Sequence, residues 1–439
     1  MISLRFEDYA HEPIPLSQRK GWLSLALIWI GGGIDLVGIL LGGQLAMGLP
    51  LKEAILSVII GSLILVFVGS LCSYVGYKTS LSTAMLSRFV FGEYGGRLVA
   101  LIIGITGLGW FGVQTGFFGI TGQVILYEWI GLELPIWLIA LIGGLLMMTT
   151  AVIGYRAIEF LSFWTVPIMI GILVALIFAV LPDRAWDTIF QYHVENNPFS
   201  LGFAISLVAG IYIVGAIASP DVARWARSTR DAIIAPIVGF FVGNSLMLFI
   251  AVIIAKASGT EELVKVMFSI GWGGFATFLF VFGAWTTNDN GLYSTGLALS
   301  VVFDKMPKHI LTLIAGLIGT LLAVVGIYNQ FIPFLTILSA FVAPIAGIYT
   351  VEFFLLDRSK FQLTHLRDIK LPPLYWQTIV VWCLATLVGM ATSPKEEYGF
   401  ELFTLTQIPA LDAILVGAIL QFIVGKFMLS RKKRTPLSA

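Results

Sequence analysis

A stretch of ten residues at positions 285–294, WTTNDNGLYS, contains the side chains of this sequence that are best suited to chemistry. It carries two hydroxyls, two amides and one carboxylate, from Thr286, Thr287, Asn288, Asn290 and Asp289. The surrounding apolar run is long enough to cross a bilayer, and lipid offers these groups no hydrogen bonds. They can join helices to one another, but five in succession favour a binding site that faces the protein interior.

Two other apolar segments are interrupted by glycines. The first reads Gly31-Gly32-Gly33-Ile34-Asp35, and the second, GIYIVG, covers residues 210–215 and is followed by Ser219-Pro220-Asp221. Glycine runs can serve close helix packing, but they also favour unwinding. Paired discontinuous helices in corresponding positions of two halves are typical of a transporter site. We therefore predict that both helices are broken there and expose free peptide groups.

A third segment, GLGWFGVQ at residues 107–114, has the residue types that bind a flat ring. Trp110 and Gln114 are four residues apart and therefore lie on one helix face. An indole stacks on a planar ring, and an amide offers a donor and an acceptor to its edge. A tryptophan in this setting can also be a simple packing residue. The glutamine in the middle of an apolar segment favours a binding site for a planar heterocycle.

The elements that must position these residues are membrane helices. The chain has 439 residues, of which 58% are hydrophobic and 12% charged, about half the charged fraction of a soluble protein. Both cysteines lie in apolar segments, so a disulfide framework is not indicated, and residues 1–21 lack the pattern of a cleavable signal peptide. We predict an all-α polytopic membrane protein with twelve spans, at 22–47, 53–76, 98–127, 135–154, 160–182, 199–219, 232–256, 270–302, 310–327, 329–350, 375–393 and 409–429.

The basic residues predict how these spans are oriented. With the N-terminus in the cytoplasm, all but five of the 26 lysines and arginines fall on the cytoplasmic side. The five exceptions are Lys52, Arg184, Lys256, Lys265 and Lys395. Both termini are then cytoplasmic, as tails at 1–21 and 431–439. The two glycine breaks predict an inverted repeat of five helices each, at 22–182 and 198–350, followed by two additional helices at 371–430.

Several motifs resemble the nucleobase–cation symporter family of the purine-cytosine permease type, and the cytosine permease branch in particular. They are RFVFG at 88–92, GWFGVQ at 109–114, WTTNDNGLY at 285–293 and the glycine-rich first span, within a similarity that covers residues 12–430. The resemblance implies the leucine-transporter-like architecture, with ten core helices in two inverted repeats and two further helices.

The resemblance also implies roles for individual residues. Trp110 and Tyr212 would stack on the two faces of a base, and Gln114 and Asn288 would hydrogen-bond its edge. Exposed backbone around Tyr212, Val214 and Gly215 would contribute to the same site. A sodium site would consist of the carbonyls of Gly31, Ile34 and Gly283 and the hydroxyls of Thr286 and Thr287. Neutral oxygen ligands suit a monovalent ion.

Asp35 departs from the pattern of the family, which has aromatic or small neutral residues there. A carboxylate beside the broken helix could compensate the charge of sodium, carry a coupling proton or contact an amine-rich substrate. It could also be a protonated or backbone-bonded residue of the interior. The family pattern also has a serine near Val214 and an asparagine in place of Gly283, so cytosine itself is only one of several candidate substrates.

We therefore predict a secondary transporter that imports a cytosine-like pyrimidine, a purine or a related planar heterocycle by sodium symport. The alternative is a proton-coupled importer of a thiamine-precursor aminopyrimidine, hydroxymethylpyrimidine, that uses Asp35. A carrier of amino acids or amines would not need Trp110, Tyr212 and Gln114, which favour a flat ring as the substrate. An intramembrane enzyme is not predicted, because no catalytic grouping of histidines, metal ligands or nucleophiles stands out. We expect a monomer in the inner membrane, with the bilayer and a small molecule as partners, no nucleic acid and no cofactor.

Overall fold

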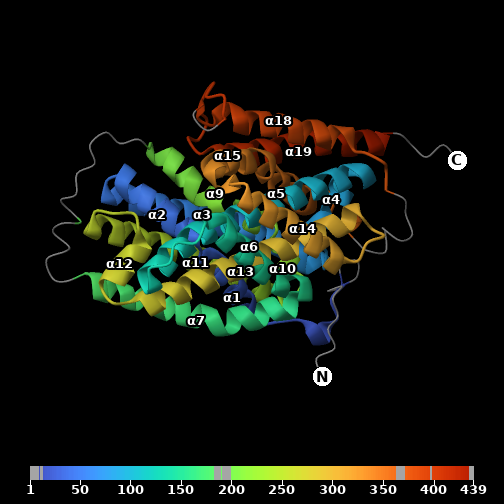
Figure 1. The fold of residues 1–439 in the computed structure, drawn as a ribbon. Helices are drawn as coiled ribbons and strands as arrows, with labels where there is room; N and C mark the ends of the chain where they lie inside the picture. Colours follow the sequence, from blue (N-terminus) through green and yellow to red (C-terminus); the bar gives the residue numbers. More distant parts are fainter. Residues whose placement is uncertain are drawn as a thin grey trace.

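The regular structure of the protein, a computed structural model, is helical throughout the described residues (Figure 1). These are Tyr9, residues 13–181, Ile189, and residues 199–361, 371–395 and 398–434. Outside this set lie more than half of the predicted N-terminal tail, the predicted repeat boundaries at 182 and 198 with all of the loop between them except Ile189, residues 362–370 and 396–397, and the last five residues.

The described residues form seventeen α-helices, which are labelled as in Figure 1 and whose bounds follow in two groups. The first group is α1 Trp22–Gly33, α2 Leu36–Gly48, α3 Leu51–Thr79, α4 Thr83–Phe91, α5 Glu93–Ile130, α6 Ile136–Ile153, α7 Tyr155–Val180, α9 Leu201–Ile217 and α10 Ser219–Ala223. The second is α11 Thr229–Ser258, α12 Leu263–Ser269, α13 Gly273–Val302, α14 Lys308–Val324, α15 Phe331–Phe341, α16 Ala343–Val351, α18 Trp376–Thr392 and α19 Pro409–Arg434.

The helices have the length and apolar character of membrane spans. Within the described residues, seven helical segments can each cross a membrane by length and composition, and the bent pair α1–α2 would be an eighth. Shorter apolar helices are α9, α14 and α18. Helix α13 has 30 residues, but the WTTNDN stretch makes it too polar for that set. The prediction of an all-helical membrane protein is confirmed, whereas the count of twelve spans stays a prediction.

The first span is broken where the sequence predicts a break. Helices α1 and α2 meet at an angle of 57°, and Ile34 and Asp35 between them have non-helical backbone. Three successive glycines weaken the end of α1, since each costs about 1 kcal/mol relative to alanine in a helix. Asp35 then starts α2 as its N-cap, because its Oδ1 accepts a hydrogen bond from Gly38 N at 2.6 Å.

The break predicted in the sixth span is in a different place. Helix α9 runs without interruption through residues 210–215, so the prediction of exposed backbone around Tyr212, Val214 and Gly215 is wrong. The chain leaves the helix at Ala218 and continues in the short helix α10. Pro220 explains this position, because proline has no N–H and its ring clashes with the preceding turn of a helix. Glycines in an apolar helix can be packing sites instead, and Gly210 lies beside Ser339.

The centre of the bundle consists of α1 and α13. From Leu25 to its end, every residue of α1 is buried, and most of α13 is buried as well. Helix α13 packs on α5, and α1 packs on α11. Helices α18 and α19 lie together along one edge of the bundle (Figure 1), with α19 against α16. The polar stretch of α13 therefore lies in the interior, as the sequence predicts.

We predict that the crossing of α1 and α11 tolerates no side chain at Gly243. A Cβ there would lie 2.8 Å from Ile30 Cα and 3.0 Å from Trp29 O, which are backbone atoms and cannot move without shifting α1. Gly243→Ala should lower the melting temperature of the purified protein, since overpacking costs about 1–3 kcal/mol. Gly171→Ala is the matched control: it lies within α7 with no atom within 4 Å of its Cβ position, so it should be neutral or slightly stabilising. Equal melting temperatures for the two variants would contradict the close crossing.

Candidate functional site

Oxygen atoms gather where the broken end of α1 meets α13. The last carbonyls of a helix have no partner within the helix, and two of them, from Gly31 and Gly32, accept hydrogen bonds from threonine hydroxyls. Thr286 Oγ1 lies 2.9 Å from Gly31 O, and Thr287 Oγ1 lies 3.2 Å from Gly32 O. Both hydroxyls also lie within 3.2 Å of Gly283 O in their own helix.

The approach of α13 to the break depends on Gly283. A Cβ at this position would lie 2.6 Å from Ile34 O, so any larger residue would push the two segments apart. The structure thus brings together all five groups that the resemblance implies for sodium, the carbonyls of Gly31, Ile34 and Gly283 and the hydroxyls of Thr286 and Thr287. These are neutral oxygen ligands at the negative end of the α1 dipole, which suits a monovalent cation. No group of three or more acidic, histidine or cysteine side chains that could hold a metal occurs in the described ranges.

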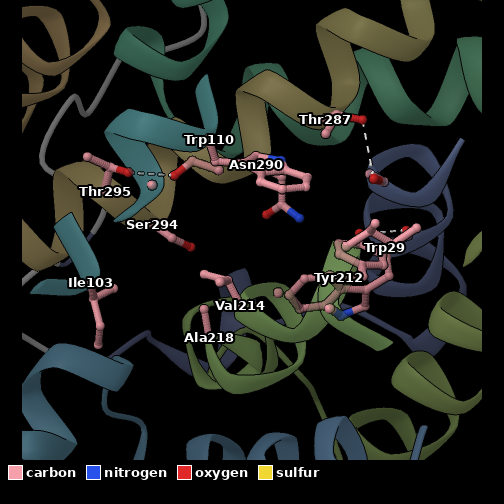
Figure 2. Close-up of a pocket in the computed structure, with 16 residues that line it drawn as sticks. Trp29, Ile103, Trp110, Tyr212, Val214, Ala218, Thr287, Asn290, Ser294 and Thr295 are labelled. Atoms are coloured by element: carbon pink, nitrogen blue, oxygen red, sulfur yellow. Dashed lines mark hydrogen bonds between the residues drawn. The ribbon is translucent and has the colours of Figure 1, made fainter. Parts of the chain in front are cut away.

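Next to this oxygen cluster lies a cavity, hereafter the central cavity, with about 640 Å³ of empty space including its open part. Its walls come from Trp29 and Gly32 of α1; Ile103, Gly107 and Trp110 of α5; Gly210, Ile211, Tyr212, Val214, Gly215 and Ala218 of α9 and its end; and Thr287, Asn290, Gly291, Ser294 and Thr295 of α13 (Figure 2).

Aromatic rings form much of the wall of the central cavity. The Tyr212 ring lies edge to face against Trp29 with ring centroids 6.2 Å apart, and its hydroxyl donates to Trp29 O at 2.8 Å. Trp110 lies on α5 and stacks on Phe334 of α15, with centroids also 6.2 Å apart. Gly32 is necessary for this arrangement, because a Cβ there would lie 2.2 Å from the Tyr212 hydroxyl oxygen. The rings are thereby fixed in place and can offer flat surfaces to a ligand.

A few polar groups complete the cavity. Figure 2 shows the Asn290 amide and the Ser294 hydroxyl pointing into the space between the aromatic residues and Ile103. Thr287 also borders the cavity, so it belongs both to the cavity wall and to the oxygen cluster. None of the residues that line the central cavity is charged. A neutral, largely apolar and flat molecule with a few hydrogen-bonding groups fits these walls best.

Two residues predicted to contact a substrate, Asp35 and Gln114, do not line the central cavity. Gln114 Nε2 donates a hydrogen bond to Asp35 Oδ2, and the other carboxylate oxygen of Asp35 accepts from Gly38 N. Both side chains are buried, at 6% and 0% exposure. The carboxylate thus has partners for both oxygens within the protein, which lowers the cost of burying it.

Asn288 is directed away from the central cavity as well. Its Nδ2 lies 3.3 Å from Thr115 Oγ1 and 3.3 Å from Met147 Sδ, so it faces α5 and α6. The neighbouring Asp289 accepts a hydrogen bond from the Thr150 hydroxyl on α6. These two residues therefore connect α13 to α6, and Asn288 does not have the position that hydrogen bonding to a substrate edge requires in this conformation.

Sequence reasoning did not assign Ser294 or Trp29 to the site, and it named Asn290 only as part of the polar stretch and not as a substrate contact. A signal for Asn290 and Ser294 was available in the sequence. Asn290 and Gly291 come three and four residues after Thr287, and Ser294 comes four and three residues after them, which places all four on one helix face. Asn288 is one position away from Thr287 and lies about 100° around the helix from it. For Trp29 no comparable signal exists.

The end of the cavity near Ala218 and Ser294 is followed by a buried polar layer. Arg224, at 1% exposure, donates to the hydroxyl of Tyr293 at 3.2 Å. Asp221 of α10 accepts from Thr83 N at 2.7 Å and so ties α10 to the start of α4. Lys20 N donates to Trp225 O at 2.6 Å and anchors the segment before α1 to the same region. This layer belongs to the side of the bundle on which the chain begins.

Comparisons with known proteins agree with this geometry. Residues 13–409 match the family model described as a permease for cytosine/purines, uracil, thiamine and allantoin. The cytosine permease of Escherichia coli strain K12 is 31% identical over 426 residues, which cover 97% of this chain and 96% of the relative. The hydantoin permease of Microbacterium maritypicum is 22% identical, with 87% and 84% covered.

A solved structure shows the same fold. Mhp1, a nucleobase-cation-symport-1 family transporter in a closed conformation with bromovinylhydantoin bound, aligns with a TM-score of 0.79 at 18% identity, covering 98% of this chain and 97% of that one. The matched proteins are permeases and transporters, so the chain is a multi-pass membrane transporter and not an enzyme. The family model over nearly the whole chain and the identity to the cytosine permease show that the chain belongs to the family of permeases for cytosine, purines, uracil, thiamine and allantoin.

Proposed function

We propose that the protein is a sodium-coupled importer of a neutral nucleobase or a closely related planar heterocycle, working by alternating access. The observation that carries this proposal is the composition of the central cavity. Aromatic side chains form its walls, Asn290 and Ser294 point into it, and no charged side chain lines it. Aromatic faces bind flat rings, and an amide can pair with the donors and acceptors on the edge of a base.

The position of Thr287 supports coupling between ion and substrate. Its hydroxyl belongs to the oxygen cluster, while the residue borders the central cavity. A cation bound by the cluster would draw α1 and α13 together and would fix one wall of the cavity. Coupling requires only that sodium binds the substrate-competent arrangement better than the alternatives. Asp35 next to the cluster could compensate part of the charge of the ion.

The substrates that this cavity favours are cytosine-like pyrimidines and purines. The relatives include a cytosine permease and a hydantoin permease, whose names both refer to flat heterocycles. An amino acid or a primary amine would need a charged partner in the cavity, and Asp35 is instead bonded to Gln114 and Gly38 N. The same contacts keep Asp35 away from the amine of an aminopyrimidine. In the alternative function, a proton-coupled importer of hydroxymethylpyrimidine, Asp35 could therefore contribute to the coupling of the proton but not to binding of the substrate.

We also propose the finer architecture: twelve spans in two inverted repeats of five, at residues 22–182 and 198–350, followed by α18 and α19. In support, the first and sixth spans are both interrupted, although in the sixth the break lies at Ala218. Helices α18 and α19 lie at the edge of the bundle (Figure 1). The distribution of lysine and arginine supports the orientation with both termini in the cytoplasm. We propose in addition that the protein is a monomer in the inner membrane.

Uptake into proteoliposomes tests the proposal directly. Labelled cytosine, uracil and hypoxanthine should be offered with an inward sodium gradient, an inward proton gradient or neither. We expect at least one of these bases to accumulate with the sodium gradient, and a sodium ionophore to abolish the accumulation. Accumulation that follows the proton gradient alone would replace sodium by a proton, and the absence of binding to any base would overturn the substrate class.

Trp110→Ala should remove a stacking surface of the central cavity. Base–aromatic stacking contributes about 1–3 kcal/mol, so affinity for the transported base should fall roughly 5- to 150-fold. Trp110→Phe keeps a ring and should retain most of the affinity. Equilibrium binding of the labelled base measures both variants, and unchanged melting temperatures establish that they are folded. Wild-type affinity in the alanine variant would exclude Trp110 from the site.

Thr287→Ala should act mainly on the ion. It removes one oxygen of the cluster, and a contact between a polar and a charged group contributes about 1.5–3 kcal/mol, so the sodium concentration for half-maximal uptake should rise by roughly tenfold or more. Thr287→Ser keeps the hydroxyl and should behave nearly as wild type. The measurement is uptake against sodium concentration. A half-maximal concentration equal to that of wild type in Thr287→Ala would argue against a cation site in the oxygen cluster.

A further inference from the structure

A second cavity, hereafter the outer groove, lies beyond the Asp35–Gln114 pair from the central cavity. It has about 810 Å³ of empty space including its open part. Its walls include Leu36 and Leu40 of α2, Phe117, Thr121 and Val124 of α5, and residues 261–265, which include the start of α12. Figure 1 shows α2 and α12 at the end of the bundle opposite the marked chain ends.

The order of residues along α5 places the two cavities in line. Gly107 and Trp110 line the central cavity, and Phe117 and Thr121 line the outer groove. Gln114 comes between them, one turn after Trp110, and lines neither cavity. The helix thus passes from one cavity wall to the other at Gln114.

The first span shows the same order. Gly32 of α1 lines the central cavity, Leu36 of α2 lines the outer groove, and Asp35 lies between them without lining either. Gln114 Nε2 donates to Asp35 Oδ2 across this position. Both side chains are buried, so the bond lies inside the wall that separates the two cavities.

We propose that the Asp35–Gln114 hydrogen bond is a gate between the outer groove and the central cavity. Asp35 is the N-cap of α2 and so moves with that helix, while Gln114 belongs to α5, which packs against the central α13. The break at residues 34–35, where the chain bends by 57°, is a ready hinge between α1 and α2. A tilt of α2 away from α5 breaks the bond and joins the two cavities, with the oxygen cluster on α1 left in place. The gate depends on the proposed function in one respect: the solute that passes through it is the solute that the protein transports.

Accessibility of introduced cysteines tests the gate without any substrate, because the native Cys72 is buried and only Cys383 must be replaced. In a Cys383→Ser background, Thr121→Cys reports on the outer groove, and Ser294→Cys reports on the central cavity. A membrane-impermeant methanethiosulfonate reagent is added to intact cells or to vesicles oriented so that Thr121→Cys reacts. We expect Ser294→Cys to be protected from this side when Asp35 and Gln114 are both present.

Three further substitutions separate the gate from the cap of α2. Asp35→Ser keeps an N-cap oxygen but is too short to reach Gln114, and Gln114→Leu removes the donor and leaves the cap intact. Both should raise the labelling rate of Ser294→Cys at least tenfold and leave that of Thr121→Cys unchanged. Asp35→Asn keeps one acceptor for the cap, and its amide N–H can donate to Gln114 Oε1 once the Gln114 amide turns over, so this variant should stay protected.

Two results would overturn the proposal. One is labelling of Ser294→Cys from the groove side with the bond intact. The other is equal protection in Asp35→Ser, Gln114→Leu and Asp35→Asn. If Asp35→Ser does not fold, Gln114→Leu decides alone. Because labelling needs neither base nor sodium, a negative result here leaves the uptake experiment independent, and failed uptake with a positive labelling result would refute the proposed function but not the gate.

Discussion

Peptide carbonyls that a broken helix leaves free inside a membrane must find donors in the protein, because lipid supplies none. The first span meets this constraint through α13. Gly31 and Gly32 end α1 with free carbonyls, and the hydroxyls of Thr286 and Thr287 lie 2.9 and 3.2 Å from them. Hydroxyls with this task must face the protein interior, which explains why the long helix that carries the WTTNDN stretch lies at the centre of the bundle.

The contact between α1 and α13 also sets the position of the central cavity. Gly32 of α1 and Thr287 of α13 line the cavity where the two helices meet, and Trp110 of α5 and Tyr212 of α9 form further parts of its wall. Trp110 belongs to α5, which packs on α13, and Tyr212 of α9 is joined to α1 by the hydrogen bond from its hydroxyl to Trp29 O. A planar solute bound there would touch the same helices that hold the oxygen cluster, and under the proposed function this shared contact would couple a cation to a base.

Asp35 shows how a carboxylate can be buried next to this site without giving the cavity a charge. It accepts one hydrogen bond from the backbone of α2 and another from Gln114. These partners hold the carboxylate in the wall between two cavities and away from the substrate space. From the sequence alone, Asp35 can be interpreted as a proton carrier or as a ligand of an amine. In the structure its side chain instead links α2 to α5.

The sequence by itself determined the features that depend on composition and on single residues. The apolar blocks predict the membrane helices, the three glycines before Asp35 predict the first break, and the polar stretch predicts that α13 faces inward. Tertiary structure alone decided which side chains meet. Adjacent residues of a helix point about 100° apart, so whether Asn288 or Asn290 faces the cavity depends on the rotation of α13 against its neighbours. The same holds for Gln114, since its partner Asp35 is 79 positions away in the chain and is brought to it only by the bend between α1 and α2.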